Sequence, residues 1–159
     1  MGTQQHQHRT STHDGQLPNS AFPSRASTDP TDKTYRGVRN PDGTCNVWAE
    51  SPATSQSASN GEISRSPLSL HLELRNHSPT GFAWGYGGSG PAQLALALLV
   101  DATSDQTLAL RHYQDFKFHF VATWADSWST TAGEIRAFLS ARENLAGCQC
   151  AFSSSCPDC

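Results

Sequence analysis

The sequence predicts an α+β fold in which a small antiparallel sheet, a hairpin plus a third strand, packs on about three helices. A Pro-Asp-Gly turn lies between two short segments that contain apolar residues. A later segment alternates leucine with polar residues, which is the period of a strand. Beyond residue 90 the apolar residues follow a helical spacing instead, so strands come first and helices follow.

The first element is a β-hairpin of residues 34–39 with 44–49. Its turn is Asn40-Pro-Asp-Gly43, in which proline presets φ and glycine accepts a positive φ. Residues 51–66 are polar and of low complexity, and we expect a flexible loop there. Four leucines at every second position from Leu68 to Leu74 then predict the third strand.

The helical part opens at Gly90-Pro91, because proline suits the first turn of a helix. Residues 92–100 are apolar on nearly all sides, which predicts a central buried helix. A second helix is expected from Ser104 or Asp105 to about residue 120, although the alternating phenylalanines leave a strand open for 116–121.

The last helix is predicted to begin at a capping box formed by Thr131 and Glu134. Ile135, Phe138 and Leu139 follow at the spacing of an inward face. Trp124 and Trp128 lie in the connection before this helix, where we expect them to close the edge of the core.

Three segments follow from this assignment: a disordered head (1–32), a single α+β domain (33–146) and a cysteine-bearing tail (147–159). The head consists mainly of Gln, His, Ser, Thr and Pro, which bury too little to offset ordering entropy. No apolar segment is long enough to cross a membrane, and no signal peptide is evident, so we expect a cytoplasmic protein. The formal net charge of −3 gives no indication of nucleic-acid binding.

The segment most indicative of function is the loop 76–91, NHSPTGFAWGYGGSGP. Glycines allow close approach of the backbone to a ligand, and the loop leads into a helix N-terminus, which favours anions. The alternative is that the glycines serve the turn and the aromatic residues pack. The candidate ligand-binding residues are Asn76, His77, Ser78, Thr80, Trp84, Tyr86, Gly87, Gly88, Ser89 and Gly90.

Other motifs are weaker. Gly85 to Gly90 matches G-x-G-x-x-G, but the preceding strand would be very short and no acidic residue stands about 20 positions on, which argues against a dinucleotide site. Arg111, Asp115 and Lys117 would lie near one another on a helix; such groups are usually surface ion pairs and otherwise could be ligands to an anion. No acid, base and nucleophile combination appears, so the sequence favours a non-enzymatic protein.

Four of the five cysteines lie in the tail: Cys148, Cys150, Cys156 and Cys159. Four thiolates suffice for a tetrahedral zinc site, and the last two have the C-x-x-C spacing of zinc ligands. The spacing between the two pairs is cramped, so disulfides or free thiols remain alternatives.

The segment Asn76-His-Ser-Pro-Thr-Gly-Phe-Ala-Trp-Gly-Tyr-Gly-Gly-Ser-Gly-Pro-Ala-Gln-Leu-Ala-Leu-Ala-Leu-Leu99, with 33–39, 113–117 and 128–135, resembles a family of small proteins that carry a domain of unknown function. The resemblance covers about residues 33–140 without the 51–66 insertion. It implies occurrence in bacteria, archaea, phages and plasmids, and hence an accessory role on a mobile element. It implies no activity.

Two functions are therefore expected for the loop 76–91. The first is non-enzymatic binding of an anionic small molecule or a nucleotide. The alternative is a protein–protein adaptor that uses the same aromatic loop as a docking surface, since tyrosine and tryptophan are frequent interface anchors.

Overall fold

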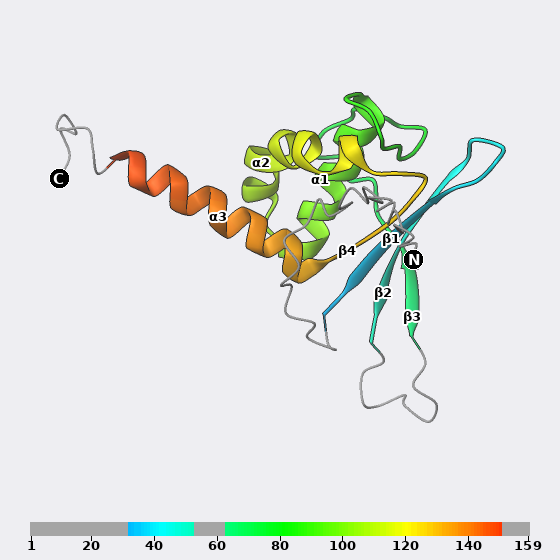
Figure 1. The fold of residues 1–159 in the computed structure, drawn as a ribbon, viewed down its shortest axis with the longest axis horizontal. Coiled ribbons are helices and arrows are strands. Elements are labelled where there is room, and N and C mark those ends of the chain that lie inside the picture. Colours follow the sequence, from blue (N-terminus) through cyan, green and yellow to red (C-terminus); the bar gives the residue numbers. More distant parts are fainter. Residues whose placement is uncertain (1–31, 53–62, 151–159) are drawn as a thin grey trace, which may run out of the picture.

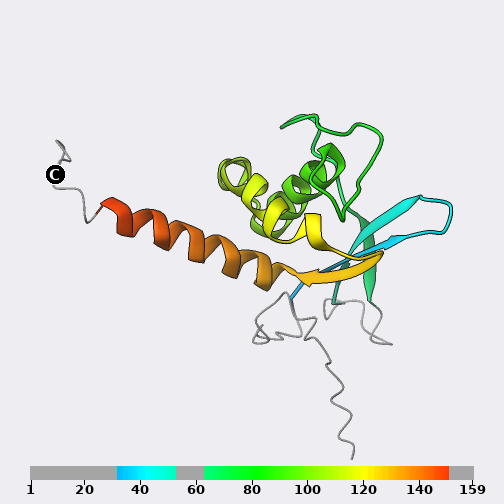
Figure 2. The ribbon, with the colours of Figure 1, turned by 45° about the horizontal axis from the view of Figure 1, so that its top comes forward.

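A computed structural model gives the fold of this chain and describes residues 32–52 and 63–150, the side chains of 146–150 excepted. Four strands form one antiparallel sheet in the order β3-β2-β1-β4. Helices α1 and α2 pack together on one side of the sheet, and the second half of α3 extends away from this body (Figures 1 and 2). The predicted α+β class, with an antiparallel sheet and three helices, is confirmed.

Strands β1 (Thr34–Arg39) and β2 (Cys45–Ser51) form the predicted hairpin. The turn between them is closed by a hydrogen bond from the amide of Asn40 to the carbonyl of Thr44, and Gly43 has a φ of +86°. The Asp42 carboxylate accepts from the amide of Thr44, at 2.9 Å. The turn sequence therefore sets the register locally.

The third strand was predicted in the wrong place. Strand β3 (Ser64–Pro67) lies in the segment expected as a loop, while residues 68–75 form no strand. The buried side chain of Gln93 donates through Nε2 to the carbonyls of Leu70 and Arg75. These carbonyls therefore bond to a side chain of α1 and not to a neighbouring strand. His71 also has a φ of +52°, which a strand does not accommodate. Residues 53–62 lie outside the described part.

Strand β4 (Ser127–Thr131) was not predicted. It pairs with β1, so that Trp128 lies opposite Gly37 and Thr130 opposite Tyr35. Trp128 stacks on Trp124 with ring centroids 4.1 Å apart, and both rings are buried. Two tryptophans do close the core edge, as expected, but one of them belongs to the sheet.

Helix α1 (Ser89–Thr103) is the central element, as predicted, and all residues from Gly90 to Val100 are buried. It packs against α2 and α3. A polar contact joins it to the sheet: the Asp101 carboxylate accepts from the Tyr35 hydroxyl at 2.7 Å and from the Lys33 ammonium at 2.9 Å. Burial of Tyr35, together with this hydrogen bond, raises the pKa of its hydroxyl well above the usual range.

Helix α2 (Gln106–His119) has Asp105 as its N-cap, whose carboxylate accepts from the amide of Leu108. It includes residues 116–119, and the one-turn 3-10 helix η1 (Val121–Thr123) follows, so the helical alternative for 116–121 is the one found. His112 is buried on the same face of α2 as Ala109 and Phe116, whereas His119 is exposed.

Helix α3 (Ala132–Cys150) begins at the predicted capping box. The Glu134 amide donates to Thr131 Oγ1 at 3.1 Å, and the Glu134 carboxylate accepts from the Thr131 amide at 2.9 Å. Ile135 and Leu139 are buried and Phe138 packs against the core. The helix continues to Cys150, into the segment expected as a tail. None of the helices in the described part combines the length and the apolar character that a membrane span needs.

Candidate functional site

The loop 76–91 lies where the N-terminus of α1 meets the C-terminus of α2. This segment, green in Figure 1, forms the top of the molecule in that view. Gly87 sits next to Phe118 of α2: a Cβ built on the glycine would lie 3.3 Å from the ring edge. The loop and the end of α2 therefore form one continuous region.

Trp84, one of the predicted ligand-binding residues, is part of the core. Its side chain has no exposed surface, and its indole N–H donates to the carbonyl of Ala125 at 2.6 Å. The ring packs edge-on against Trp128, and the Arg39 guanidinium lies over it and donates to its carbonyl. The role of Trp84 is structural.

Gln93 fixes the first part of the loop. Its side chain is fully buried, and Oε1 accepts from the amides of His77 and Ser78 at 2.7 and 3.1 Å. The Ser78 hydroxyl donates to the carbonyl of Gly81 at 2.8 Å. These predicted donors are therefore used within the loop, whereas the side chains of Asn76 and Thr80 are exposed.

His77 faces α2 and makes a side-chain hydrogen bond there. Its Nε2 lies 3.0 Å from the Tyr113 hydroxyl, and the two rings are in contact. The pKa of His77 is lowered, first by burial, which disfavours the imidazolium, and then by the positive charges of Arg75 and Lys117. His77 is therefore neutral at pH 7 and adds no charge to the region.

The glycines of the loop serve two different purposes. Gly85 has a φ of +82° and a built Cβ would lie 3.0 Å from the carbonyl of Trp124; at Gly90 it would lie 2.7 Å from the Cβ of Ala83. These two glycines are required by the fold. At Gly87 and Gly88 a Cβ would meet only the side chains of Phe118 and Tyr86, both of which are exposed. Gly87 is exposed and Gly88 is half-buried.

Gly88 is the N-cap of α1, and no side chain caps this end. The first amides of a helix have no partner within it, and Pro91 has none to offer, so the donors at this end are those of Ser89 and Gly90. Ser89 is exposed and adds a hydroxyl to this end of the helix. The helix dipole adds partial positive charge here.

Lys117 provides the charge of the site. It is 6% exposed, and its ammonium lies 3.9 Å from the centre of the Phe118 ring. A lysine is rarely this buried unless it is paired, yet no carboxylate pairs with Lys117 within the described part of the chain. Because Phe118 also contacts Gly87, the unpaired ammonium and the loop share one neighbour.

The trio predicted on α2 is separated in the structure. Arg111 turns to α3 and pairs with Glu143 at 3.2 Å, and Asp115 is exposed. Lys117 alone is near the loop. Sequence reasoning included this lysine only as a member of the trio, since its burial depends on how α2 packs against the segment before α1.

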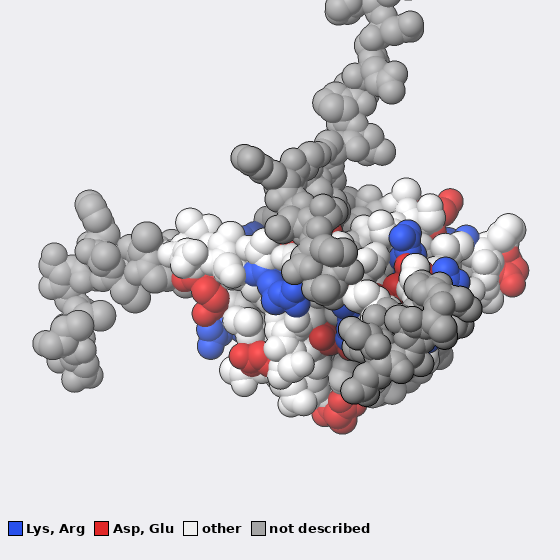
Figure 3. Space-filling model, turned by 90° about the horizontal axis from the view of Figure 1, so that it is seen from below, with Lys and Arg blue, Asp and Glu red and all other residues white. Residues whose placement is uncertain are grey.

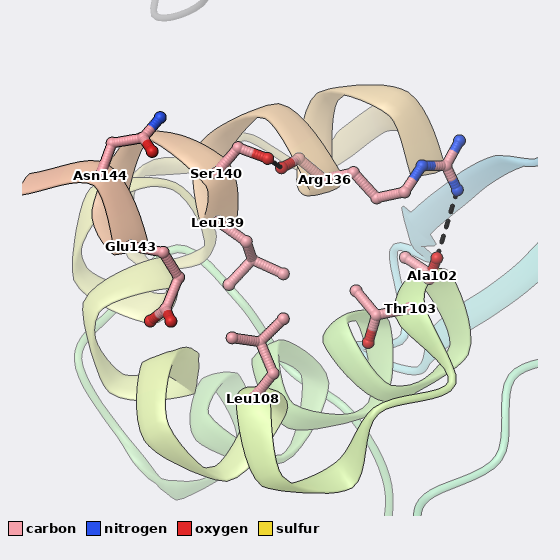
Figure 4. Close-up of a pocket in the computed structure, with 8 residues that line it drawn as sticks. All are labelled: Ala102, Thr103, Leu108, Arg136, Leu139, Ser140, Glu143 and Asn144. Atoms are coloured by element: carbon pink, nitrogen blue, oxygen red, sulfur yellow. Dashed lines mark hydrogen bonds between the residues drawn. The ribbon is translucent and has the colours of Figure 1, made fainter. Parts of the chain in front are cut away.

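A concave region lies between α3 and the junction of α1 with α2, with a volume of about 460 Å³ (Figure 4). Leu108, Leu139 and Ala102 give it an apolar floor. Its charged groups are already engaged: Arg136 donates to the carbonyl of Ala102 and to Asp32, and Glu143 binds His112 and Arg111. Its polar rim therefore stabilises helix packing.

The predicted zinc ligands cannot be placed. The side chains of Cys148 and Cys150 and all of Cys156 and Cys159 lie outside the described residues. Within residues 32–52 and 63–145, no three potential ligands cluster as a metal site would require. Zinc in the tail remains a prediction.

The G-x-G-x-x-G match lacks the context of a dinucleotide site. Coil precedes Gly85, and every strand pairing of the sheet is antiparallel. The fingerprint depends on a strand leading directly into the glycine turn, within a parallel βαβ unit. The first and last glycines of the match, Gly85 and Gly90, are explained by the backbone conformation and contacts given above.

The fold and this loop–helix arrangement are those of a small α+β protein. A model for a family of unknown function, DUF6166, matches residues 35–141. The chain belongs to this family. No curated protein matches the chain, and no solved structure matches it either.

Proposed function

We propose that the protein is a non-enzymatic accessory protein that binds an anionic small molecule at the end of α1, with Lys117, Ser89 and the amides that follow Gly88 as donors. The observation that carries this proposal is the burial of Lys117 without a carboxylate partner in the described part of the chain. Burying a charge is costly unless it is compensated, and an anionic ligand would compensate it.

Two further features support an anion. The uncapped N-terminus of α1 lies in the same region, and helix N-termini bind phosphate and carboxylate groups. The charged groups that act on His77 of the loop, Arg75 and Lys117, are both positive. A phosphate, or the phosphate of a nucleotide, satisfies both the amides and the ammonium.

A thermal-shift screen with inorganic phosphate, AMP, ATP and citrate tests the proposal. A ligand that binds only the folded state stabilises it by about 2.7 kcal/mol at a concentration 100 times its Kd, which raises the melting temperature. Lys117→Met retains the apolar stem but should abolish the increase. Lys33→Met is the matched control, because Lys33 is the only other lysine and pairs with Asp101 at the sheet. An equal increase with inorganic phosphate or citrate in the Lys117→Met variant would exclude this site.

The alternative function is a protein–protein adaptor, and one observation favours it. Tyr86 is 52% exposed and Phe118 60%, and they flank Gly87 and Gly88. Adjacent exposed aromatic rings are typical of interface anchors. On this alternative, Tyr86→Ser and Phe118→Ser abolish binding to a purified partner, whereas Lys117→Met retains it. Anion binding gives the opposite pattern.

The accessory role on a mobile element rests on the family resemblance, and the cytoplasmic location rests on the sequence. Genes that encode phage or plasmid functions beside this one would support the first. Fractionation of cells that express the tagged protein would test the second.

A further inference from the structure

The face of the sheet that points away from α1 carries a second pocket, of about 430 Å³. Its lining comes from three strands: Arg36 and Val38 of β1, Trp48 of β2, and Ser127 and Ser129 of β4. Arg36 lies opposite Trp48 in the pairing of β1 with β2 and opposite Ser129 in the pairing of β1 with β4, so an arginine, an indole and a serine are neighbours on this face. This pocket is separate from the loop 76–91.

The charged groups around the pocket are held in a specific arrangement by Glu50. Its side chain is 9% exposed, and it accepts from Nε of Arg36 at 2.7 Å and from Nε of Arg65 at 2.9 Å. Both arginines use Nε in these bonds, and no hydrogen bond engages their terminal nitrogens among residues 32–52 and 63–150. Arg36 and Arg65 carry two positive charges and Glu50 carries one negative charge, so these three side chains have a net charge of +1.

The indole of Trp48 is also fixed. Its N–H donates to Glu50 at 3.0 Å, and the Arg65 guanidinium lies over the ring on the β3 side, 5.6 Å from its centre. The pocket lies toward β1 and β4. A ring held by two contacts loses little conformational freedom when a planar ligand packs against it.

We infer that this pocket binds a nucleoside monophosphate, with the base against Trp48 and the phosphate on the guanidinium of Arg36 and the hydroxyls of Ser127 and Ser129. Arginine binds phosphate through two parallel N–H donors, and bases stack on aromatic side chains. The volume is in the range of small-molecule sites.

Charge distribution favours a single nucleotide over a nucleic-acid strand. The formal net charge is −3. In the described part of the face shown in Figure 3, basic and acidic side chains are interspersed in small groups. A strand of nucleic acid needs a continuous basic groove along several phosphates, whereas one phosphate needs one guanidinium with a few additional donors.

Calorimetric titration of the full-length chain with AMP tests this inference. We expect a Kd below about 1 mM in 0.15 M salt. Adenosine and inorganic phosphate should each bind at least about tenfold more weakly, because each makes only one of the two sets of contacts. Absence of AMP binding at about ten times that concentration would overturn the inference.

Variants assign the site. Arg36→Gln and Trp48→Leu should each weaken AMP binding about tenfold or more, while Trp48→Phe, which keeps a ring, should retain most of it. Arg36→Gln leaves Glu50 with Arg65 and Trp48 as partners, so it should still fold even if Trp48→Leu does not. Arg111→Gln, an arginine that pairs with Glu143 away from the sheet, is the matched control and should bind as wild type.

The outcome also separates this pocket from the loop 76–91. If AMP binding is lost in Lys117→Met but retained in Arg36→Gln, the nucleotide binds at the loop and the sheet pocket is excluded. Loss in Arg36→Gln with retention in Lys117→Met supports the sheet pocket, whatever binds at the loop. Tight binding of a ten-nucleotide strand without binding of AMP would contradict the preference for a single nucleotide.

Discussion

Gln93 joins α1 to the segment 70–78, and replacing it with leucine should destabilise the protein by about 4 kcal/mol. The fully buried amide makes four hydrogen bonds, to two backbone N–H and two backbone carbonyl groups, at 2.6–3.1 Å. Each is worth about 1 kcal/mol net, and leucine fills a similar volume, so no large cavity adds to the loss. The backbone groups that lose Gln93 as a partner belong to a partly exposed segment. Water can hydrate some of them, which limits the loss of stability.

Urea unfolding, followed by far-ultraviolet circular dichroism, measures this free energy. Gln114→Leu is the matched control, because Gln114 is on α2 and its side chain makes no hydrogen bond within the described part of the chain. The control should change the free energy of unfolding by less than about 0.5 kcal/mol. If Gln93→Leu loses less than about 1 kcal/mol, the amide does not hold the segment as argued.

Four further predictions follow from the core, the loop and the tail. Leu96→Ala should cost about 2–5 kcal/mol in urea unfolding, because its side chain is fully buried; a loss below about 0.5 kcal/mol would mean that α1 is not central. Gly90→Ala should cost about 1–3 kcal/mol, since the added methyl meets Ala83, whereas Gly87→Ala should stay within about 1 kcal/mol, and equal losses would refute the distinction. The lowered pKa of His77 means that the unfolded chain takes up a proton first as the pH falls, so stability should decrease from about pH 6.5 down to the folded pKa; the same decrease in His77→Gln would assign it to other groups. If the tail holds zinc, metal analysis should find about one ion per chain, and Cys156→Ser should lose it; protein from zinc-supplemented medium without metal would leave the thiol or disulfide alternatives.

The elements predicted correctly are those whose determinants are local. The hairpin depends on Asn40-Pro-Asp-Gly43, and the start of α3 depends on Thr131 with Glu134, each a few residues apart. The central helix is apolar on all sides, and burial is the only environment that suits such a sequence. In these places the sequence and the fold impose the same conformation.

The errors arise where contacts distant in sequence decide the structure. The alternating leucines of 68–74 satisfy the pattern of a strand, but Gln93 binds the backbone of this segment from α1. Strand β4 has only Trp128 and Thr130 directed to the core, so five residues contain too short an alternation to detect. Its existence depends on pairing with β1, nearly 100 residues earlier.

The candidate site was predictable in part. Glycine-rich composition before a helix N-terminus indicated the loop, and Gly87, Gly88 and Ser89 do lie at the uncapped end of α1. Sequence could not distinguish these glycines from Gly85 and Gly90, because the difference is what a side chain at each would meet. Nor could it reveal that Lys117, unlike Arg111, is buried without a partner within the described residues, which depends on tertiary packing.

The most direct test of the proposed function is a titration of the ¹⁵N-labelled protein with inorganic phosphate, followed by amide chemical shifts. We predict that the largest shifts occur at the amides of Gly88, Ser89 and Gly90 and that they disappear in Lys117→Met. The Lys33→Met control should shift as wild type does. Shifts confined to other parts of the chain, or unchanged shifts at the start of α1 in Lys117→Met, would contradict an anion site formed by α1 and Lys117.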